Sequence, residues 1–261
     1  MAENSEMIRE HVQLVRARLY PLIRLDRFPE VDRLITRFES IVSDWEAGRL
    51  PDASAIVECN NEICVAIELL GQKLTAHFSL AYEPAVTLTG QSIDFLMSYG
   101  DQQHYFDVKT IAPRDPQDAK SKWEKYEELR ELFPTNADLV LAEQWMGGEF
   151  WHFFSSARAK FLDYALGLEQ KIAALTQLPG RTVRMIFCGD RIRWTRDQLE
   201  DFADFYHTGV FRPDDAMRTL QAHYLREKKI VIERTIDGFC HMKRAPLDLR
   251  ASNFVIDVRG P

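Results

Sequence analysis

The segment SIDFLMSYGDQQHYFDVKTIAP, residues 92–113, has the pattern of two strands joined by a tight turn, yet both predicted strands carry charge. Asp94 interrupts the first strand, and Asp107 and Lys109 interrupt the second. A buried strand tolerates charged side chains only where they are paired or bind a metal ion, because an isolated buried charge is costly. The segment therefore predicts either a buried ion pair or an ion-binding site inside a hairpin.

The spacing of these residues favours an ion-binding site. Side chains alternate across a strand, so Tyr105, Asp107 and Lys109 share one face. The turn GDQQ at residues 100–103 folds the second strand back, which brings Asp94 opposite that face at a cross-strand spacing of roughly 5 Å. Two carboxylates at this spacing repel each other unless a cation lies between them. Oxygen ligands with open water positions suit Mg²⁺ or Mn²⁺, and these ions are the predicted cofactor.

Lys109 distinguishes this pair of acids from a purely structural one. An ammonium beside the metal ligands is suited to orient a metal-bound water or to stabilise charge on a phosphate. The pattern acid–any–lysine is common by itself, and it recurs at Asp118–Lys120 and Glu227–Lys229. Of the matches in this chain, only Asp107–Lys109 lies in a predicted strand that follows another acid-bearing strand.

The rest of the chain alternates helical and extended patterns. Apolar residues recur with helical period in 5–23 and 29–45, a third helix is predicted over 52–71, and an extended run covers 74–88. Further helices are predicted at 118–133, 156–175, 195–209 and 214–229, and extended segments at 137–145, 181–194, 235–242 and 254–258. From residue 53 the order is helix, three strands, helix and strand. This order predicts an α/β fold with a mixed sheet.

The stretches SIDF and YFDVKT, preceded by an acid-bearing helix, resemble the PD-(D/E)XK nuclease superfamily, which includes many restriction endonucleases. The resemblance covers roughly residues 53–145. It implies that Asp94 and Asp107 are metal ligands and that Lys109 is the catalytic lysine. Ile93 stands where the motif that names the family has proline.

The resemblance also implies the domain organisation. We expect a restriction endonuclease-like core flanked by helices at 53–145, with a C-terminal elaboration at 146–261. Together they would form a nuclease-like domain over 53–261. An N-terminal helical extension would cover residues 1–52.

Members of this superfamily often add a glutamate from the first core helix, and Glu58, Glu62 and Glu68 are candidates here. At about 100° per residue, the apolar residues define one inward face of the helix. Glu62 lies at the flank of this face, Glu58 further round, and Glu68 nearly opposite. Glu62 is therefore the predicted third metal ligand, and a solvated helix acid is the alternative.

The charge distribution bears on the substrate. Residues 1–170 hold 17 Lys and Arg against 28 Asp and Glu, whereas residues 171–261 hold 16 against 12. The basic C-terminal region could meet phosphate. The predicted nucleic-acid-binding residues are Arg191 and Arg193, together with Lys120 and Lys122, and a solvated surface is the alternative. The expected partner is DNA, with RNA left open, and a homodimer is compatible with the sequence.

The sequence lacks the motifs of several other classes of enzyme. The sequence has no Walker loop, dinucleotide-binding fingerprint or GxSxG elbow. No apolar run approaches the roughly 18 residues of a membrane span, and the acidic N-terminal segment is unlike a signal peptide. A cytoplasmic location without membrane partners is expected.

The sequence thus predicts a metal-dependent nuclease with catalytic residues Asp94, Asp107 and Lys109. Two alternatives remain open at this point. One is a nuclease-fold protein that serves as an inactive nucleic-acid-binding or assembly module. The other is a hydrolase that acts on a different substrate with Asp94 and Asp107 as an acid–base pair.

Overall fold

A computed structural model describes residues 2–23, 28, 30–51, 54–71, 78–86, 91–111, 156–173, 179–189, 196–209, 231–243 and 253–255. Its contacts divide the chain into two units. The first unit comprises Met1–Thr110, Leu168–Asp190 and Thr235–Pro261, and the second comprises Ile111–Gly167 and Arg191–Arg234. All the residues of the candidate site that the structure describes belong to the first unit.

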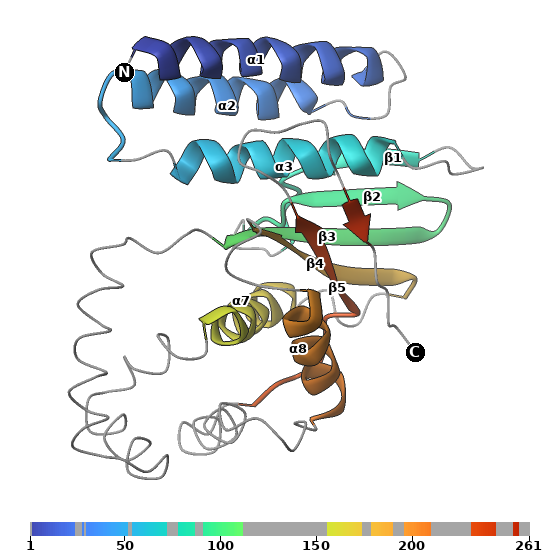
Figure 1. The fold of residues 1–261 in the computed structure, drawn as a ribbon. Helices are drawn as coiled ribbons and strands as arrows, with labels where there is room; N and C mark the ends of the chain where they lie inside the picture. The colour runs from blue at the N-terminus through green and yellow to red at the C-terminus, as the bar shows by residue number, and fades with distance from the viewer. Residues whose placement is uncertain are drawn as a thin grey trace, which may run out of the picture. The chain divides into compact units, whose positions relative to one another are not determined.

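Three helices form one side of the first unit, as the helical periodicity predicts. They are α1 (Ala2–Ile23), α2 (Val31–Glu46) and α3 (Ser54–Leu70). Figure 1 shows α1 and α2 lying side by side, with α3 between them and the sheet. Because α3 is a middle layer, it is buried over most of its circumference and not along one stripe only.

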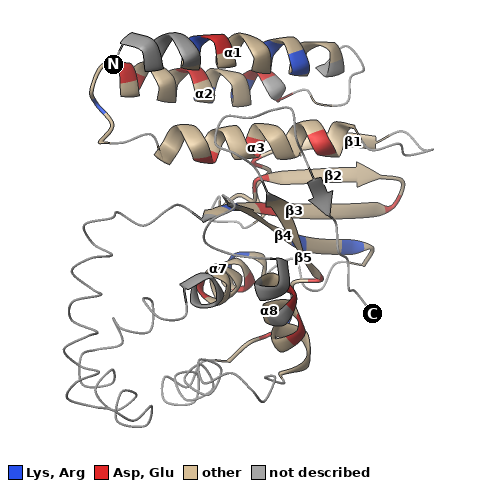
Figure 2. Ribbon diagram, viewed as in Figure 1, with Lys and Arg blue, Asp and Glu red and all other residues tan. Residues whose placement is uncertain are grey.

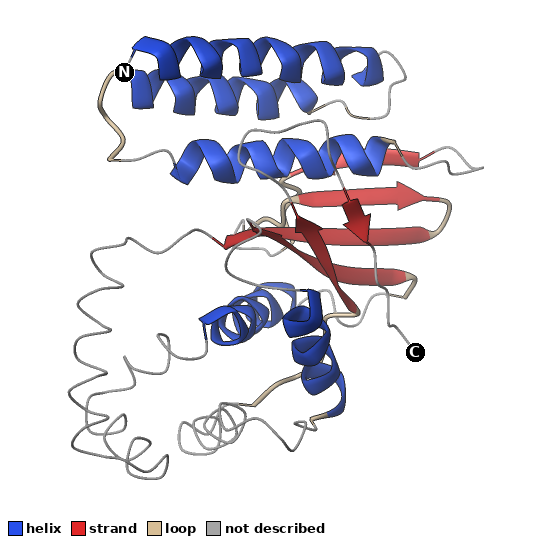
Figure 3. Cartoon of the chain, in the orientation of Figure 1, coloured by secondary structure: helices blue, strands red, loops and turns tan. Residues whose placement is uncertain are grey.

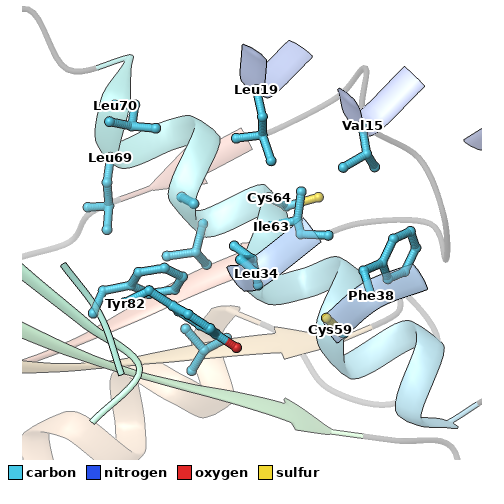
Figure 4. Packing of buried hydrophobic residues seen from close by; sticks show 14 of the residues in the cluster. Val15, Leu19, Leu34, Phe38, Cys59, Ile63, Cys64, Leu69, Leu70 and Tyr82 are labelled. Carbon is cyan, nitrogen blue, oxygen red and sulfur yellow. The ribbon is translucent and has the colours of Figure 1, made fainter. Parts of the chain in front are cut away.

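Apolar side chains from all three helices fill the space between these layers. Leu19 of α1, Leu34 and Phe38 of α2, and Ile63 of α3 are fully or almost fully buried in one cluster, which Figure 4 shows from close by. Burial of each such side chain is worth about 1.5–3 kcal/mol. This packing holds α2 close to α3, so that side chains of the two helices can contact each other.

The sheet has six strands among the described residues, in the order β1-β2-β3-β4-β5-β6. The strands are β1 (Phe78–Tyr82), β2 (Phe95–Tyr99), β3 (Gln102–Ile111), β4 (Arg181–Gly189), β5 (Gly238–Lys243) and β6 (Asn253–Val255). The pairs β1–β2, β2–β3 and β5–β6 are antiparallel, and β4–β5 is parallel. The sheet is therefore mixed, as the sequence predicts, and Figure 3 shows it in red.

Two further helices are described. The helix α7 (Ser156–Ile172) begins in the second unit, and its last residues, from Leu168 on, belong to the first. The helix α8 (Arg196–Thr208) lies in the second unit, where Phe202 packs against Phe161 of α7 with ring centroids 5.5 Å apart. Helices at both positions are predicted from the sequence.

Two glycines shape the hairpin and its neighbour. Gly100 has a φ of 55° at the turn between β2 and β3, a left-handed conformation that favours glycine. Gly180, with a φ of 69°, comes just before β4, and a Cβ there would lie 2.7 Å from the Asp101 carbonyl oxygen. Its own carbonyl accepts a 2.9 Å hydrogen bond from Gln103 N–H. Glycine is thus required where the hairpin meets the start of β4.

The predicted order of elements is confirmed from the first helix to β3, and for the segments that became α7, β4, α8, β5 and β6. The predicted helices at 118–133 and 214–229 and the predicted strand at 137–145 lie outside the described residues. The predicted boundary between residues 52 and 53 stays a prediction.

Candidate active site

The β2–β3 hairpin has the register that the sequence predicts. Phe95 lies opposite Phe106, so continuing the pairing by one residue sets Asp94 across from Asp107. The Oδ2 atom of Asp94 accepts a 2.5 Å hydrogen bond from Val108 N–H. The two aspartates therefore meet where β2 begins. Figure 2 shows acidic positions in red along α3 and at both ends of the β2–β3 hairpin.

Asp107 is buried and faces two ammonium groups. Its side chain is 1% exposed. Lys109 Nζ lies 2.7 Å from its Oδ2, and Lys171 Nζ, near the end of α7, lies 2.8 Å from its Oδ1. The predicted Asp107–Lys109 pair is present, and Lys171 adds a second lysine that the sequence analysis did not identify. The carboxylate thus has a cation at each oxygen.

Asp94 holds its proton more tightly than an ordinary aspartate. Its pKa is raised from 3.8 to about 6, chiefly by burial and also by the negative charge of Asp107, whereas Lys109, the Val108 N–H and Lys171 oppose the rise. Desolvation and a nearby like charge both disfavour the ionised carboxylate. A cation placed between the two aspartates would relieve this repulsion, because it would favour the ionised form of both.

The backbone around Asp94 is fixed by the chain that leaves β1. Glu83 has a φ of 48°, which is unusual for a residue with a side chain, and its N–H donates a 2.9 Å hydrogen bond to the Asp94 carbonyl oxygen. A left-handed residue of this kind costs on the order of 1–3 kcal/mol, which the surrounding structure must supply. The position of Asp94 is therefore set by two strands and not by the hairpin alone.

Glu62 of α3 is buried as well, and it is held by two partners. Its Oε2 accepts a 2.5 Å hydrogen bond from Arg37 of α2 and a 2.8 Å hydrogen bond from the hydroxyl of Tyr82 on β1. Arg37 also donates a hydrogen bond to the Tyr82 hydroxyl oxygen. Glu62 thus belongs to a buried polar group that joins α2, α3 and β1. The sequence analysis predicted Glu62 as a metal ligand from its position at the flank of the helix and did not identify these two partners.

The pKa of Glu62 is raised from 4.5 to about 7, and burial is the largest cause. The negative charge of Asp94 adds to the rise, and the Arg37 charge and the hydrogen bonds from Tyr82 and Arg37 oppose it. Because the charge of Asp94 acts on Glu62, the helix acid is electrostatically coupled to the hairpin. The charges of Glu62 and Asp94 therefore act on each other across α3 and the hairpin.

The other two helix acids differ from Glu62. Glu58 is exposed, whereas Glu68 is half-buried, although the angular argument placed it on the solvent side of α3. The reason is the layer formed by α1 and α2, which covers the side of α3 that faces away from the sheet. A single helix face cannot reveal this second layer.

A divalent cation in a protein site is held by ligand atoms that lie close together. Among the described residues, no group of three or more His, Cys, Asp or Glu side chains is arranged to hold a metal ion. Protein sites often hold Mg²⁺ through one or two carboxylates with several waters, so Asp94 and Asp107 are a suitable kind of ligand pair, and their binding of Mg²⁺ stays a prediction. Asp107 Oδ2 is a buried acceptor without a hydrogen bond from the described residues, although Lys109 lies beside it. Glu62 as a third ligand stays a prediction.

The predicted nucleic-acid-binding residues Arg191, Arg193, Lys120 and Lys122 lie outside the described residues. Three residues of the site were missed by the sequence analysis, namely Lys171, Arg37 and Tyr82. Lys171 follows Glu169 with the same acid–any–lysine spacing as Asp107–Lys109, but in a helix this spacing sends the two side chains to different faces. Arg37 and Tyr82 belong to no motif in the sequence that would mark them as partners of Glu62.

The raised pKa of Glu62 predicts a dependence of stability on pH. Between pH 4.5 and about 7 the folded protein binds more protons at this group than the unfolded chain. The stability that Glu62 contributes is therefore fully present below pH 4.5 and is lost as pH rises through about 7. In Glu62→Gln, the free energy of unfolding should fall less over this pH range than in the wild type, by on the order of 3 kcal/mol. Chemical denaturation at a series of pH values measures it.

Glu58→Gln is the matched control, since Glu58 is an exposed acid on the same helix. Its pH dependence should equal that of the wild type. Identical slopes for Glu62→Gln and Glu58→Gln would contradict the assigned burial of Glu62.

No helix among the described residues is both long and apolar enough to span a membrane. Comparison of the chain with protein-family models, curated proteins and solved structures found no match.

Proposed function

We propose that this protein is a metal-dependent phosphodiesterase that hydrolyses DNA, in which Asp94 and Asp107 hold Mg²⁺ or Mn²⁺ and Lys109 assists the reaction. One observation carries the proposal. The buried carboxylate of Asp107 lies across from Asp94, with Lys109 2.7 Å from it on the same strand. The resemblance of the hairpin sequence to the PD-(D/E)XK nucleases rests on these same residues, two acids and a lysine.

The order of the described elements supports the same proposal. From α3 to β3 they follow one another as a helix and three antiparallel strands. The superfamily core begins with this order, and its predicted second helix at 118–133 and last strand at 137–145 lie outside the described residues. Glu62 on the preceding helix matches the position from which members of the superfamily contribute a further acid.

The proposed reaction forms a bond between a water oxygen and phosphorus and breaks one ester P–O bond, and the leaving oxygen takes up a proton. A bound divalent cation would neutralise charge on the phosphate and lower the pKa of its water. Asp94 and Asp107 would hold that cation. The ammonium group of Lys109 would stabilise the negative charge that develops on the phosphate oxygens.

A second candidate function is favoured by a different observation. Both oxygens of Asp107 face lysines, and the two aspartates are balanced in charge by Lys109 and Lys171. Such a cluster needs no cation to be stable. A nuclease-fold protein that binds nucleic acid or assembles with a partner, without turnover, would have this property.

A cleavage assay separates the two candidates. Supercoiled plasmid and labelled DNA and RNA oligonucleotides would be incubated with the protein in Mg²⁺, in Mn²⁺ and in a chelator. We expect cleavage of DNA that requires the cation and is lost in Asp94→Asn. Asp101→Asn, which alters an exposed acid in the turn of the same hairpin, should cleave like the wild type. Binding of DNA without cleavage of any substrate would favour the binding module.

A further inference from the structure

The second lysine at Asp107 exceeds what that carboxylate needs. One ammonium suffices to neutralise one carboxylate, and Lys109 is already supplied by the same strand. Lys171 comes from 64 residues further along the chain, at the end of α7, and contacts the other oxygen of Asp107. The fold therefore brings a second cation to the site from a distant element.

The exposed fractions of the three side chains indicate which of them a ligand can reach. The side chains of Lys109 and Lys171 are 28% and 25% exposed, whereas that of Asp107 is 1% exposed. Two partly exposed lysine side chains thus lie against a buried carboxylate. An ammonium carries three N–H donors, so a lysine that contacts Asp107 through one of them can also bind an oxygen of an incoming anion.

The net charge of these four side chains changes when a divalent cation binds. With both aspartates ionised, Asp94 and Asp107 are neutralised by Lys109 and Lys171. A divalent cation held by the two aspartates would leave the cluster with an excess of positive charge. A phosphodiester carries the negative charge that would offset this excess, and either ammonium group can then turn to it.

We propose that Lys171 is a second functional lysine of this site, which pairs with Asp107 until substrate binds and then binds a phosphate group of the nucleic acid. This inference rests on the proposed function, because it takes the ligand to be a phosphodiester. Lys171 competes with a divalent cation for Asp107 and contributes one phosphate contact. Lys109 keeps its role at the scissile phosphate.

Two binding measurements on the full chain test this role without relying on cleavage. Removing the competing ammonium in Lys171→Met should tighten Mn²⁺ binding in the absence of DNA by about fivefold or more, measured by calorimetry. The same variant should bind a labelled DNA oligonucleotide less tightly in Ca²⁺. Loss of one phosphate contact should reduce the slope of log affinity against log salt by about one.

Two further variants serve as controls. Lys171→Arg keeps the positive charge and should keep the salt slope of the wild type. Arg49→Met removes an exposed positive charge that pairs with Asp44 elsewhere in the first unit, and it should change neither the Mn²⁺ affinity nor the salt slope. Thermal melts of all variants check that each one is folded.

The outcomes separate this inference from the proposed function. An unchanged salt slope in Lys171→Met, or weaker Mn²⁺ binding together with a lower melting temperature, would overturn the role of Lys171 even if the wild type cleaves DNA. Tighter Mn²⁺ binding and a reduced slope would support it even if the wild type cleaves nothing, in which case the proposed hydrolysis alone fails. A wild type that binds neither Mn²⁺ nor DNA would overturn both.

Discussion

Lys109→Ala should reduce DNA cleavage by at least about 10²–10³-fold while leaving the protein folded. The loss of rate follows from removing a cation aimed at the developing charge of the phosphate, and a single such donor is typically worth this factor. Stability should change little because Lys171 still pairs with Asp107 in this variant. Lysine is not a ligand for Mg²⁺, so Mn²⁺ affinity should not fall. The measurements are the cleavage rate, the melting temperature and Mn²⁺ calorimetry.

Arg49→Ala is the control for this variant, since it removes an exposed positive charge outside the hairpin, where it pairs with Asp44. It should retain full activity. A stable Lys109→Ala protein that cleaves DNA at the wild-type rate would refute the proposed role of Lys109. Equal losses of activity in both variants would point to net charge instead of the site.

Asp107→Asn should be both inactive and markedly less stable. The amide has no negative charge, so the ammonium groups of Lys109 and Lys171 lose the carboxylate that both of them contact. Two positive charges then face a neutral side chain. Breaking a buried ion pair in this way costs about 3–5 kcal/mol. For a protein of this size such a loss lowers the melting temperature by on the order of 10 °C. Mn²⁺ binding should weaken in parallel, because a charged oxygen ligand is lost.

Asp101→Asn is the matched variant, because Asp101 is an exposed aspartate in the turn of the same hairpin. It should melt and cleave like the wild type. An Asp107→Asn protein of wild-type stability would mean that the two lysine contacts contribute nothing to folding. The comparison with Lys109→Ala is informative because only Asp107→Asn removes the group that both lysines share.

The local part of the site could be predicted from the sequence. The period-two alternation of a strand gives Asp107 and Lys109 a common face, and the glycine turn fixes which residues of the two strands are opposite. The register with Phe95 opposite Phe106 agrees with that reasoning. Helical periodicity likewise separated Glu62 from Glu58, because burial and exposure of a helix face follow its apolar residues.

The partners of these acids could not be predicted in the same way. Arg37, Tyr82 and Lys171 lie on α2, β1 and α7, and each contacts its acid only because whole elements pack together. Nothing in the local pattern of α2 distinguishes Arg37 from an arginine on a solvated face. The half-buried state of Glu68 has the same origin, since the α1–α2 layer covers the outer side of α3.

The amino-acid sequence by itself determined the hairpin, its register and the meeting of Asp94, Asp107 and Lys109, because these depend on backbone geometry over some fifteen residues. Only the tertiary structure decided how the charges are balanced. It assigned a second lysine to Asp107, and an arginine and a tyrosine to Glu62, through contacts across 64, 25 and 20 residues of chain. Such contacts arise from the burial of apolar faces elsewhere in the fold, and the charged residues that meet are carried there by the elements to which they belong.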